Sequence, residues 1–208
     1  NGVALAGLIL DLRENGGGTK QSATRLADLF LNFGAVCATQ QSDGRIRTER
    51  ASTRTSRLSG IPLVILINER SASASELLAG ALQGTGDAVV VGERSYGKGS
   101  AQSVFSFQLG LIKLTTDWFA VPTQTGIRFI DRSRSPETWG VRPNLEVRAA
   151  NNHDRAIRSA RGQWYAHRGE DVPPERSTTD LEVIDSDDRA LILGLAVLEA
   201  RVARETTQ

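Results

Sequence analysis

Residues 61–86 read IPLVILINERSASASELLAGALQGTG and combine a strand, a turn and a helix. Residues 61–68 are short and almost entirely apolar, which favours a strand buried within a sheet. Residues 73–86 are rich in alanine, glycine and leucine, so we expect a helix that packs closely against its neighbours. Ser73 and Glu76 match the S-x-x-E pattern of a capping box, which predicts the start of that helix without requiring any function.

The same order of strand and helix continues on both sides of this segment. Buried strands are predicted at 5–12 and 88–93, and a helix is predicted at 20–34, where apolar residues recur at helical spacing and stop at Gly34. This alternation predicts an α/β fold with a largely buried sheet. Further strands are predicted at 35–41 and 45–51, around an Asp43-Gly44 turn, and at 102–108 and 111–121, on either side of Gly110.

The pattern changes toward the C-terminus. Residues 153–168 predict a helix, 169–179 a loop and 188–205 a final amphipathic helix. We therefore divide the chain into a catalytic core, residues 1–149, and a C-terminal helical extension, residues 150–208.

The composition is that of an ordinary globular protein and argues against several classes. The 25 basic and 24 acidic residues give a net charge of +1, so nothing favours nucleic acid or an anionic membrane as a partner. No apolar run approaches the roughly 18–20 residues that span a bilayer. The single cysteine, Cys37, cannot form an internal disulfide. The chain has no methionine and opens almost directly on an apolar strand, so we expect further sequence upstream, which would hold any targeting segment.

The stretch GERSYGKGSAQ, residues 92–102, has part of the spacing of a phosphate-binding loop. Gly99 replaces the required serine or threonine, and the residues that follow alternate like a strand instead of starting a helix. The glycine run at 15–18 likewise lacks the spacing of a dinucleotide-binding motif. Taken alone, each stretch is explained by a glycine turn, and Lys98 by a solvated surface lysine.

Three turns point to chemistry when they are considered together. Asn15–Gly18, Ser71–Ser75 and Gly97–Gly99 each follow a predicted apolar strand. Because the ends of parallel strands converge on one crevice, a hydroxyl, a lysine and backbone N–H groups would meet there. These are the parts of an acyl-transfer site: a nucleophile, a base and oxyanion donors. His153 and His167 lie outside these turns, so a Ser-His-Asp site is not supported.

With these motifs, residues from about 5 to 147 resemble the C-terminal processing, or tail-specific, peptidases. LILDLRENGGG (8–18) is similar to the family's strand-and-glycine motif, although Gly16 stands where many members have proline. The family's nucleophile segment, lysine segment and closing turn resemble PLVILINERSASASELLAGALQ (62–83), VVGERSYGKGSAQ (90–102) and GVRPN (140–144). Members usually carry an upstream PDZ domain, which reads the substrate's C-terminus and which this chain does not contain.

The resemblance implies a role for individual residues. The nucleophile would be Ser73, the general base Lys98, the residue that orients the lysine Gln102, and the oxyanion donors the N–H groups of Ala74 and of either Gly17 or Gly18. The implied reaction is cleavage of protein substrates near accessible C-termini by a Ser-Lys dyad, without a cofactor or metal. The implied fold is a crotonase-like ββα superhelix, and the implied location is extracytoplasmic, in a bacterial envelope or a plastid lumen.

A lysine can act as a base near neutral pH only if its pKa is lowered. The ordinary value is about 10.4, and burial can lower it to about 7–8, so we expect Lys98 to be buried. Gln102 lies four residues on, about 13 Å along a straight strand, so we expect a bulge or turn near Gly99. A carboxylate close to the lysine would raise its pKa, and we therefore favour capping or positioning as the role of Glu76.

Two other functions stay open. One is an inactive relative that binds peptides or apolar ligands. The other is a crotonase-type enzyme that acts on coenzyme A thioesters and uses glycine-rich N–H groups to bind an enolate oxygen. Neither needs Ser73, Lys98 and Gln102 together, so their joint presence favours the peptidase.

Overall fold

The structure of the protein is a computed structural model, and it describes residues 5–52, 57–148 and 188–205. The predicted helix at 153–168, the predicted loop at 169–179 and both histidines lie outside the described residues.

A parallel sheet forms the centre of the described part of the chain. Its strands are β1 (Leu8–Asp11), β4 (Leu63–Ile67), β5 (Ala88–Gly92) and β9 (Leu145–Glu146), in the order β1-β4-β5-β9. Each neighbouring pair is parallel, and every residue of β4 is buried. The predicted α/β fold with a buried central sheet is therefore confirmed. The two-residue strand β9 was not predicted, because its sequence is too short to show a period.

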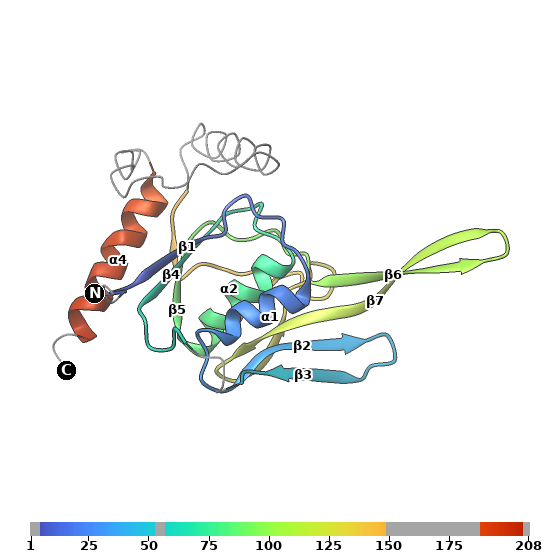
Figure 1. The fold of residues 1–208 in the computed structure, drawn as a ribbon. Coiled ribbons are helices and arrows are strands. Elements are labelled where there is room, and N and C mark those ends of the chain that lie inside the picture. Colours follow the sequence, from blue (N-terminus) through green and yellow to red (C-terminus); the bar gives the residue numbers. More distant parts are fainter. Residues whose placement is uncertain (1–4, 53–56, 149–187, 206–208) are drawn as a thin grey trace, which may run out of the picture.

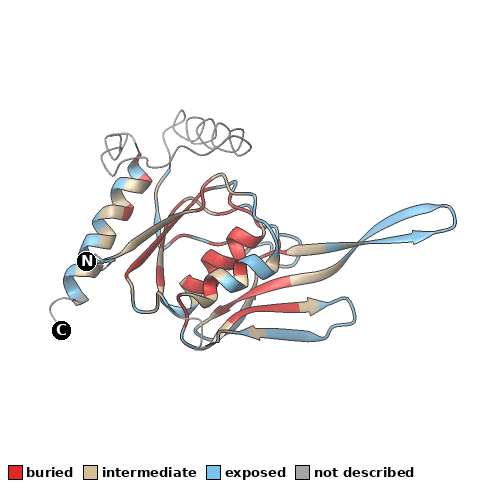
Figure 2. Ribbon diagram, in the orientation of Figure 1, coloured by how far each residue is buried: buried red, intermediate tan, exposed pale blue. Residues whose placement is uncertain are grey.

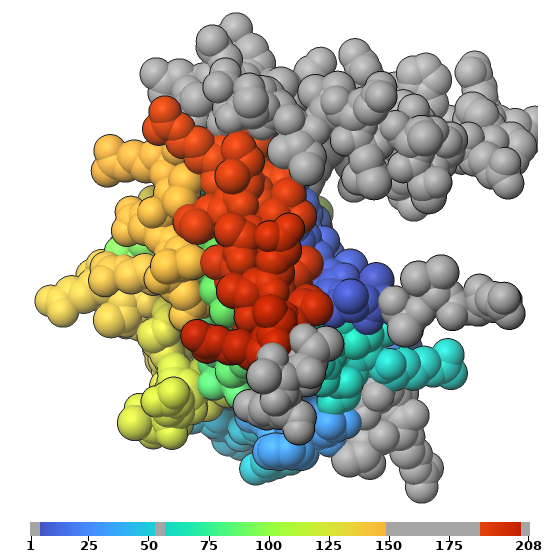
Figure 3. Space-filling model, turned by 90° about the vertical axis from the view of Figure 1, so that its left-hand side faces the viewer, coloured from blue at the N-terminus to red at the C-terminus, as the bar shows by residue number. Residues whose placement is uncertain are grey.

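Helices cover both faces of this sheet (Figure 1). Helices α1 (Lys20–Asp28) and α2 (Ala74–Thr85) lie on one face, and α4 (Arg189–Glu205) lies on the other. Figure 3 shows α4, in red, lying across its face between the blue N-terminal segment and the orange segment that leads to β9. The predicted end of α1 at Gly34 is wrong. The Leu29 and Phe30 N–H groups donate to carbonyls three residues back, and this tightening ends the regular helix.

A second, antiparallel sheet covers the outer side of α2. It has the order β3-β2-β7-β6, with β8 paired to β7; the strands are β2 (Ala35–Gln41), β3 (Ile46–Arg50), β6 (Ser100–Phe107), β7 (Gly110–Thr123) and β8 (Gly126–Phe129). The described residues thus form four layers: helix α4, the parallel sheet, helices α1 and α2, and the antiparallel sheet. Figure 2 shows α2 almost wholly buried between the two sheets, whereas the outer part of the β6–β7 hairpin is exposed.

Small residues on α2 allow the second sheet to come close. A Cβ atom added at Gly84 would lie 2.0 Å from the carbonyl oxygen of Pro122, and one added at Gly80 would lie 2.8 Å from a methyl group of Val121. The small-residue pattern of residues 73–86 therefore has a packing cause, as the sequence predicted.

The close approach at Gly84 gives a test of the fold. In an open helix Gly→Ala stabilises by about 1 kcal/mol, but here we expect Gly84→Ala to lower the free energy of unfolding by about 2 kcal/mol through overpacking. Urea denaturation measures the change. Gly16→Ala is the control, because a Cβ at Gly16 meets nothing within 4 Å. A Gly84→Ala protein as stable as the control would contradict this packing.

Candidate active site

The turn after β4 holds Ser73 in a conformation that serine rarely adopts. Its φ is 58° and its ψ is −117°, a backbone strain of about 1–3 kcal/mol. The two residues before Ser73 fix the turn through hydrogen bonds. The Ser71 hydroxyl donates to the Leu12 carbonyl at 2.8 Å and accepts the Asn68 N–H at 3.0 Å, while the Ala72 N–H donates to the Asn15 carbonyl at 3.0 Å. Ser73 is consequently presented, half-buried, at the start of α2.

The glycine loop that follows β1 lies directly against this turn. A Cβ at Gly17 would stand 2.5 Å from the Ala72 oxygen and 2.8 Å from the Ala74 nitrogen, and Gly17 has a φ of +99°. Only glycine fits this position. The structure therefore brings together two of the three turns that the sequence singled out.

The candidate oxyanion donors differ in what they already bind. The Gly17 N–H donates to Asn15 Oδ1 at 2.9 Å. The N–H groups of Ala74 and Gly18 donate to no acceptor within the described ranges. Ala74 N also stands at the N-terminus of α2, where the helix dipole favours negative charge. This arrangement favours Ala74 and Gly18 over Gly17 as a pair of donors.

Glu76, whose side chain is fully buried, joins the Gly97–Gly99 turn to the Ser71–Ser75 turn. Its Oε2 accepts the N–H groups of Ser73 and Lys98, each at 2.8 Å. Its Oε1 accepts the Gly97 N–H and the Ser95 hydroxyl, each at 2.6 Å. The Ser95 oxygen accepts the Val141 N–H, so its proton is directed at Glu76.

Every group that contacts Glu76 here donates a hydrogen bond to it, and each oxygen accepts two. This is the pattern of a carboxylate. Burial raises the pKa of Glu76, and the hydrogen bonds from Ser95, Gly97, Lys98 and Ser73 oppose that shift. The carboxylate thus holds the nucleophile turn and the lysine turn in one place. The sequence showed only its capping pattern; the contacts with Ser95, Gly97 and Lys98 are long-range.

The Lys98 side chain does not meet the expectation of burial. Its backbone is held by Glu76, but the residue is exposed, because its side chain leaves the turn on the solvent side. Within the described part of the chain, no hydrogen bond joins its amine to the Ser73 hydroxyl. Gln102 is also exposed, and its Nε2 donates weakly to the Ser100 hydroxyl at 3.4 Å. The backbone N–H groups of the predicted dyad, Ser73 and Lys98, therefore share one carboxylate oxygen, but no hydrogen bond joins the two side chains within the described residues.

The backbone irregularity expected near Gly99 is present. The pairing of β6 with β7 shifts register between Ala101 and Gln102. Gly99 itself is held by Asp131, which accepts its N–H at 3.1 Å. A Cβ at Gly99 would lie 2.5 Å from the Asp131 nitrogen, so the turn needs glycine there. Asp131 and Ser95 anchor the lysine turn, and no short motif in the sequence indicated either of them.

Other routes to catalysis have little support in the described ranges. Burial raises the pKa of the Cys37 thiol to about 12, so this cysteine is not an activated nucleophile. The described residues contain no group of His, Cys, Asp and Glu side chains placed to hold a metal ion. None of the described helices combines the length and apolarity that crossing a membrane requires.

Comparison with known proteins assigns the fold and its motifs to a family. The sequence model of peptidase family S41 matches residues 1–147. The chain belongs to peptidase family S41.

Members of this family with curated names include close relatives of the chain. It is 39% identical over 147 residues to a carboxy-terminal-processing protease of Bartonella bacilliformis, covering 69% of this chain and 31% of that protein. It is 34% identical to a chloroplastic C-terminal processing peptidase of Tetradesmus obliquus, covering 69% of this chain and 29% of the relative. The chain thus spans about a third of the length of these relatives.

Solved structures show the same fold. A photosystem II D1 C-terminal processing protease superimposes with a TM-score of 0.58 and 33% identity, over 69% of this chain and 35% of that one. Mature CPAF in complex with lactacystin has a TM-score of 0.54 and 14% identity, over 77% of this chain and 43% of that one, which shows likeness of fold alone.

The central place of Glu76 can be tested by Glu76→Gln. Glutamine keeps the size but turns one acceptor into an NH₂ donor that faces backbone N–H groups. We expect the free energy of unfolding to fall by about 3 kcal/mol, because buried donors lose their acceptor, and Tm to fall by roughly 2–4 °C per kcal/mol in a chain of this size. Calorimetry measures both. The exposed Glu69→Gln is the control, and an equal Tm for the two variants would show that Glu76 does not hold the turns.

Proposed function

We propose that this chain carries the catalytic centre of a serine endopeptidase that cleaves protein substrates near their C-termini. The observation that carries the proposal is the Glu76 carboxylate, which accepts the backbone N–H groups of Ser73 and Lys98 on the same oxygen, each at 2.8 Å. The backbones of the proposed nucleophile and the proposed base are thereby held on one oxygen, which supports this pairing. The names of the relatives agree with this activity.

In the proposed reaction the Ser73 hydroxyl attacks a peptide carbonyl, and its proton passes to the Lys98 amine. The carbonyl oxygen becomes an oxyanion, which the Ala74 and Gly18 N–H groups bind. Such a donor contributes roughly 10²–10³ in rate. Lys98 then gives its proton to the leaving amine, and water hydrolyses the acyl-Ser73 ester with Lys98 again as base.

Exposure of Lys98 constrains how this base is activated. A peptide laid over Ser73 and between the lysine turn and the glycine loop would remove water from the exposed amine and bring it into a closed site. Gln102, two residues beyond Ser100 in β6, would then orient the amine by accepting a hydrogen bond from it.

The remaining parts of the proposal concern the whole protein. The core of residues 1–149 corresponds to a crotonase-like catalytic unit, and residues 150–208 to a helical extension. Substrates are proteins with accessible C-termini. An extracytoplasmic location, in a bacterial envelope or a plastid lumen, agrees with relatives from bacteria and chloroplasts.

The nucleophile is tested by Ser73→Ala. Loss of a nucleophile in comparable sites lowers kcat on the order of 10⁶-fold, so we expect no measurable cleavage of a peptide substrate and no labelling by an acylating probe. Tm should stay within a few degrees of the wild type. Ser75→Ala, two residues on, is the matched control and should be labelled and active.

Absence of labelling at Ser73 in a folded wild-type protein would favour an inactive binding relative. A thermal shift with coenzyme A, together with activity in Ser73→Ala, would favour the thioester enzyme.

The base is tested by Lys98→Arg. Arginine keeps the positive charge but cannot release its proton, because its pKa stays above about 12. We therefore expect Lys98→Arg to be as inactive as Lys98→Ala, and wild-type kcat/KM to rise with pH as one group loses its proton. Substantial cleavage by a folded Lys98→Arg protein would exclude Lys98 as the base.

A further inference from the structure

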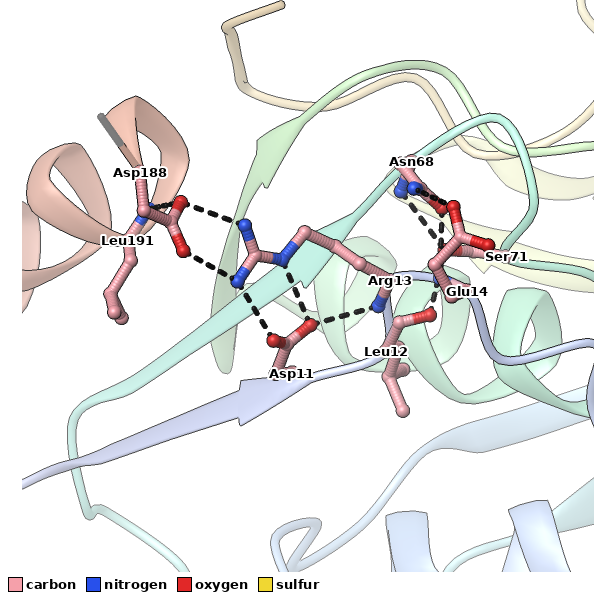
Figure 4. Close-up of polar contacts among 8 residues, drawn as sticks. All are labelled: Asp11, Leu12, Arg13, Glu14, Asn68, Ser71, Asp188 and Leu191. Atoms are coloured by element: carbon pink, nitrogen blue, oxygen red, sulfur yellow. Dashed lines mark hydrogen bonds and ion pairs between the residues drawn. The ribbon is translucent and has the colours of Figure 1, made fainter. Parts of the chain in front are cut away.

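Arg13 forms a buried ion cluster at the end of β1, just before the glycine loop. Its side chain is 4% exposed. Two guanidinium nitrogens donate to the two oxygens of Asp188, at 2.7 and 2.9 Å, and two donate to Asp11, at 2.8 and 3.1 Å. Figure 4 shows the guanidinium lying between the two carboxylates. The hydrogen bonds and charges of Asp11 and Asp188 outweigh the effect of burial and raise the pKa of Arg13, so it carries its charge at every relevant pH.

Asp188 belongs to the start of the C-terminal helix. Its Oδ1 accepts the Leu191 N–H at 2.9 Å, which caps α4. The helix itself is fixed by close packing on the parallel sheet: a Cβ at Gly194 would lie 3.0 Å from Leu66, and one at Gly7 would lie 2.8 Å from Leu198. The position of Asp188 is consequently set by α4, and through Asp188 the position of Arg13.

The residues that follow Arg13 carry this constraint to the nucleophile. Glu14 has a left-handed φ of 58°. Its N–H donates to Asn68 Oδ1 at 3.0 Å, and its carboxylate accepts the Asn68 Nδ2 at 2.9 Å (Figure 4). The next carbonyl, of Asn15, accepts the Ala72 N–H. A continuous series of contacts therefore links α4, through Arg13 and Glu14, to the backbone beside Ser73.

We propose that Asp188 and Arg13 are positioning residues, through which the C-terminal helix holds the glycine loop against Ser73 in the geometry that binds the oxyanion. A buried ion pair adds little net stability compared with apolar side chains of the same volume. Paired hydrogen bonds from one guanidinium instead fix the orientation of the two carboxylates relative to the arginine. The catalytic part of this inference rests on the proposed function; the structural part, control of the loop by α4, does not.

The experiment compares Asp188→Asn with Leu198→Ala. Asparagine keeps the size and can still cap α4, but it removes the charge that faces Arg13. Leu198→Ala weakens the same helix through its packing on the parallel sheet, and it lies ten residues along the chain from Asp188. Arg13→Lys is a second test, because lysine keeps the charge and loses the paired hydrogen bonds.

The first readout is independent of catalysis. Amide hydrogen exchange of residues 14–18 is measured in a Ser73→Ala background at a temperature where each protein is folded. We expect Asp188→Asn and Arg13→Lys to speed this exchange about tenfold, which corresponds to a shift of about 1.4 kcal/mol in local opening. Leu198→Ala should speed exchange in α4 and leave residues 14–18 near the wild-type rate. Equal exchange of 14–18 in all three variants would overturn the proposal.

The second readout is kinetic. A displacement of about 1 Å in a catalytic group can cost 10²-fold, so we expect Asp188→Asn to lower kcat by about that factor with little change in KM. The affinity for a peptide aldehyde, whose adduct places an oxyanion in the site, should fall with kcat, and Leu198→Ala should keep both. If Asp188→Asn lowers Tm but keeps kcat and the aldehyde affinity, as expected for Leu198→Ala, the pair is merely structural. If no protein cleaves peptides, the proposed function fails, and the exchange measurement still decides the role of the pair.

Discussion

The buried carboxylate of Glu76 is the contact on which the arrangement of the candidate site depends. Removing a carboxylate from water costs several kcal/mol, and hydrogen bonds from Ser73, Ser95, Gly97 and Lys98 offset that cost. The donors come from two turns that are distant in sequence. The ion is therefore stable only when both turns are in place, and this couples the position of the nucleophile to that of the lysine.

The glycine loop is held by a different principle, from the opposite side of the parallel sheet. Arg13 links the start of the glycine loop to α4 through Asp188. In the middle of the loop, Gly17 packs closely against Ala72 and Ala74 of the turn that holds Ser73. The parallel strands β1, β4 and β5 bring the three turns to one edge, as their topology requires. The sheet brings the turns to the same edge, and the Glu76 carboxylate and the Arg13 ion cluster then fix their exact positions.

The sequence predicted the parts of this site far better than their contacts. Strand and helix periods, and the glycines at 17, 97 and 99, follow from local rules, and the structure places them as expected. The role of Glu76 was visible only as a cap, because its other donors lie 19 to 22 residues away. Strands β8 and β9 are too short to show a period. The exposure of Lys98 could not be predicted because its turn is held by Glu76 and Asp131, which are distant in sequence.

Strain and exposure have complementary places in the site. Ser73 and Glu14 are the non-glycine residues of the described chain with positive φ; the Ser73 N–H donates to Glu76 in α2, and the Glu14 N–H donates to Asn68. Their backbones cannot relax without breaking those bonds, so the nucleophile and the loop stay in position without a substrate. At Lys98 the backbone is held by Glu76 while the side chain is exposed, so the fixed part of this residue is its main chain. In the proposed mechanism a bound peptide removes water from the exposed Lys98 side chain, while Glu76 keeps hold of the main chain at Ser73 and Lys98.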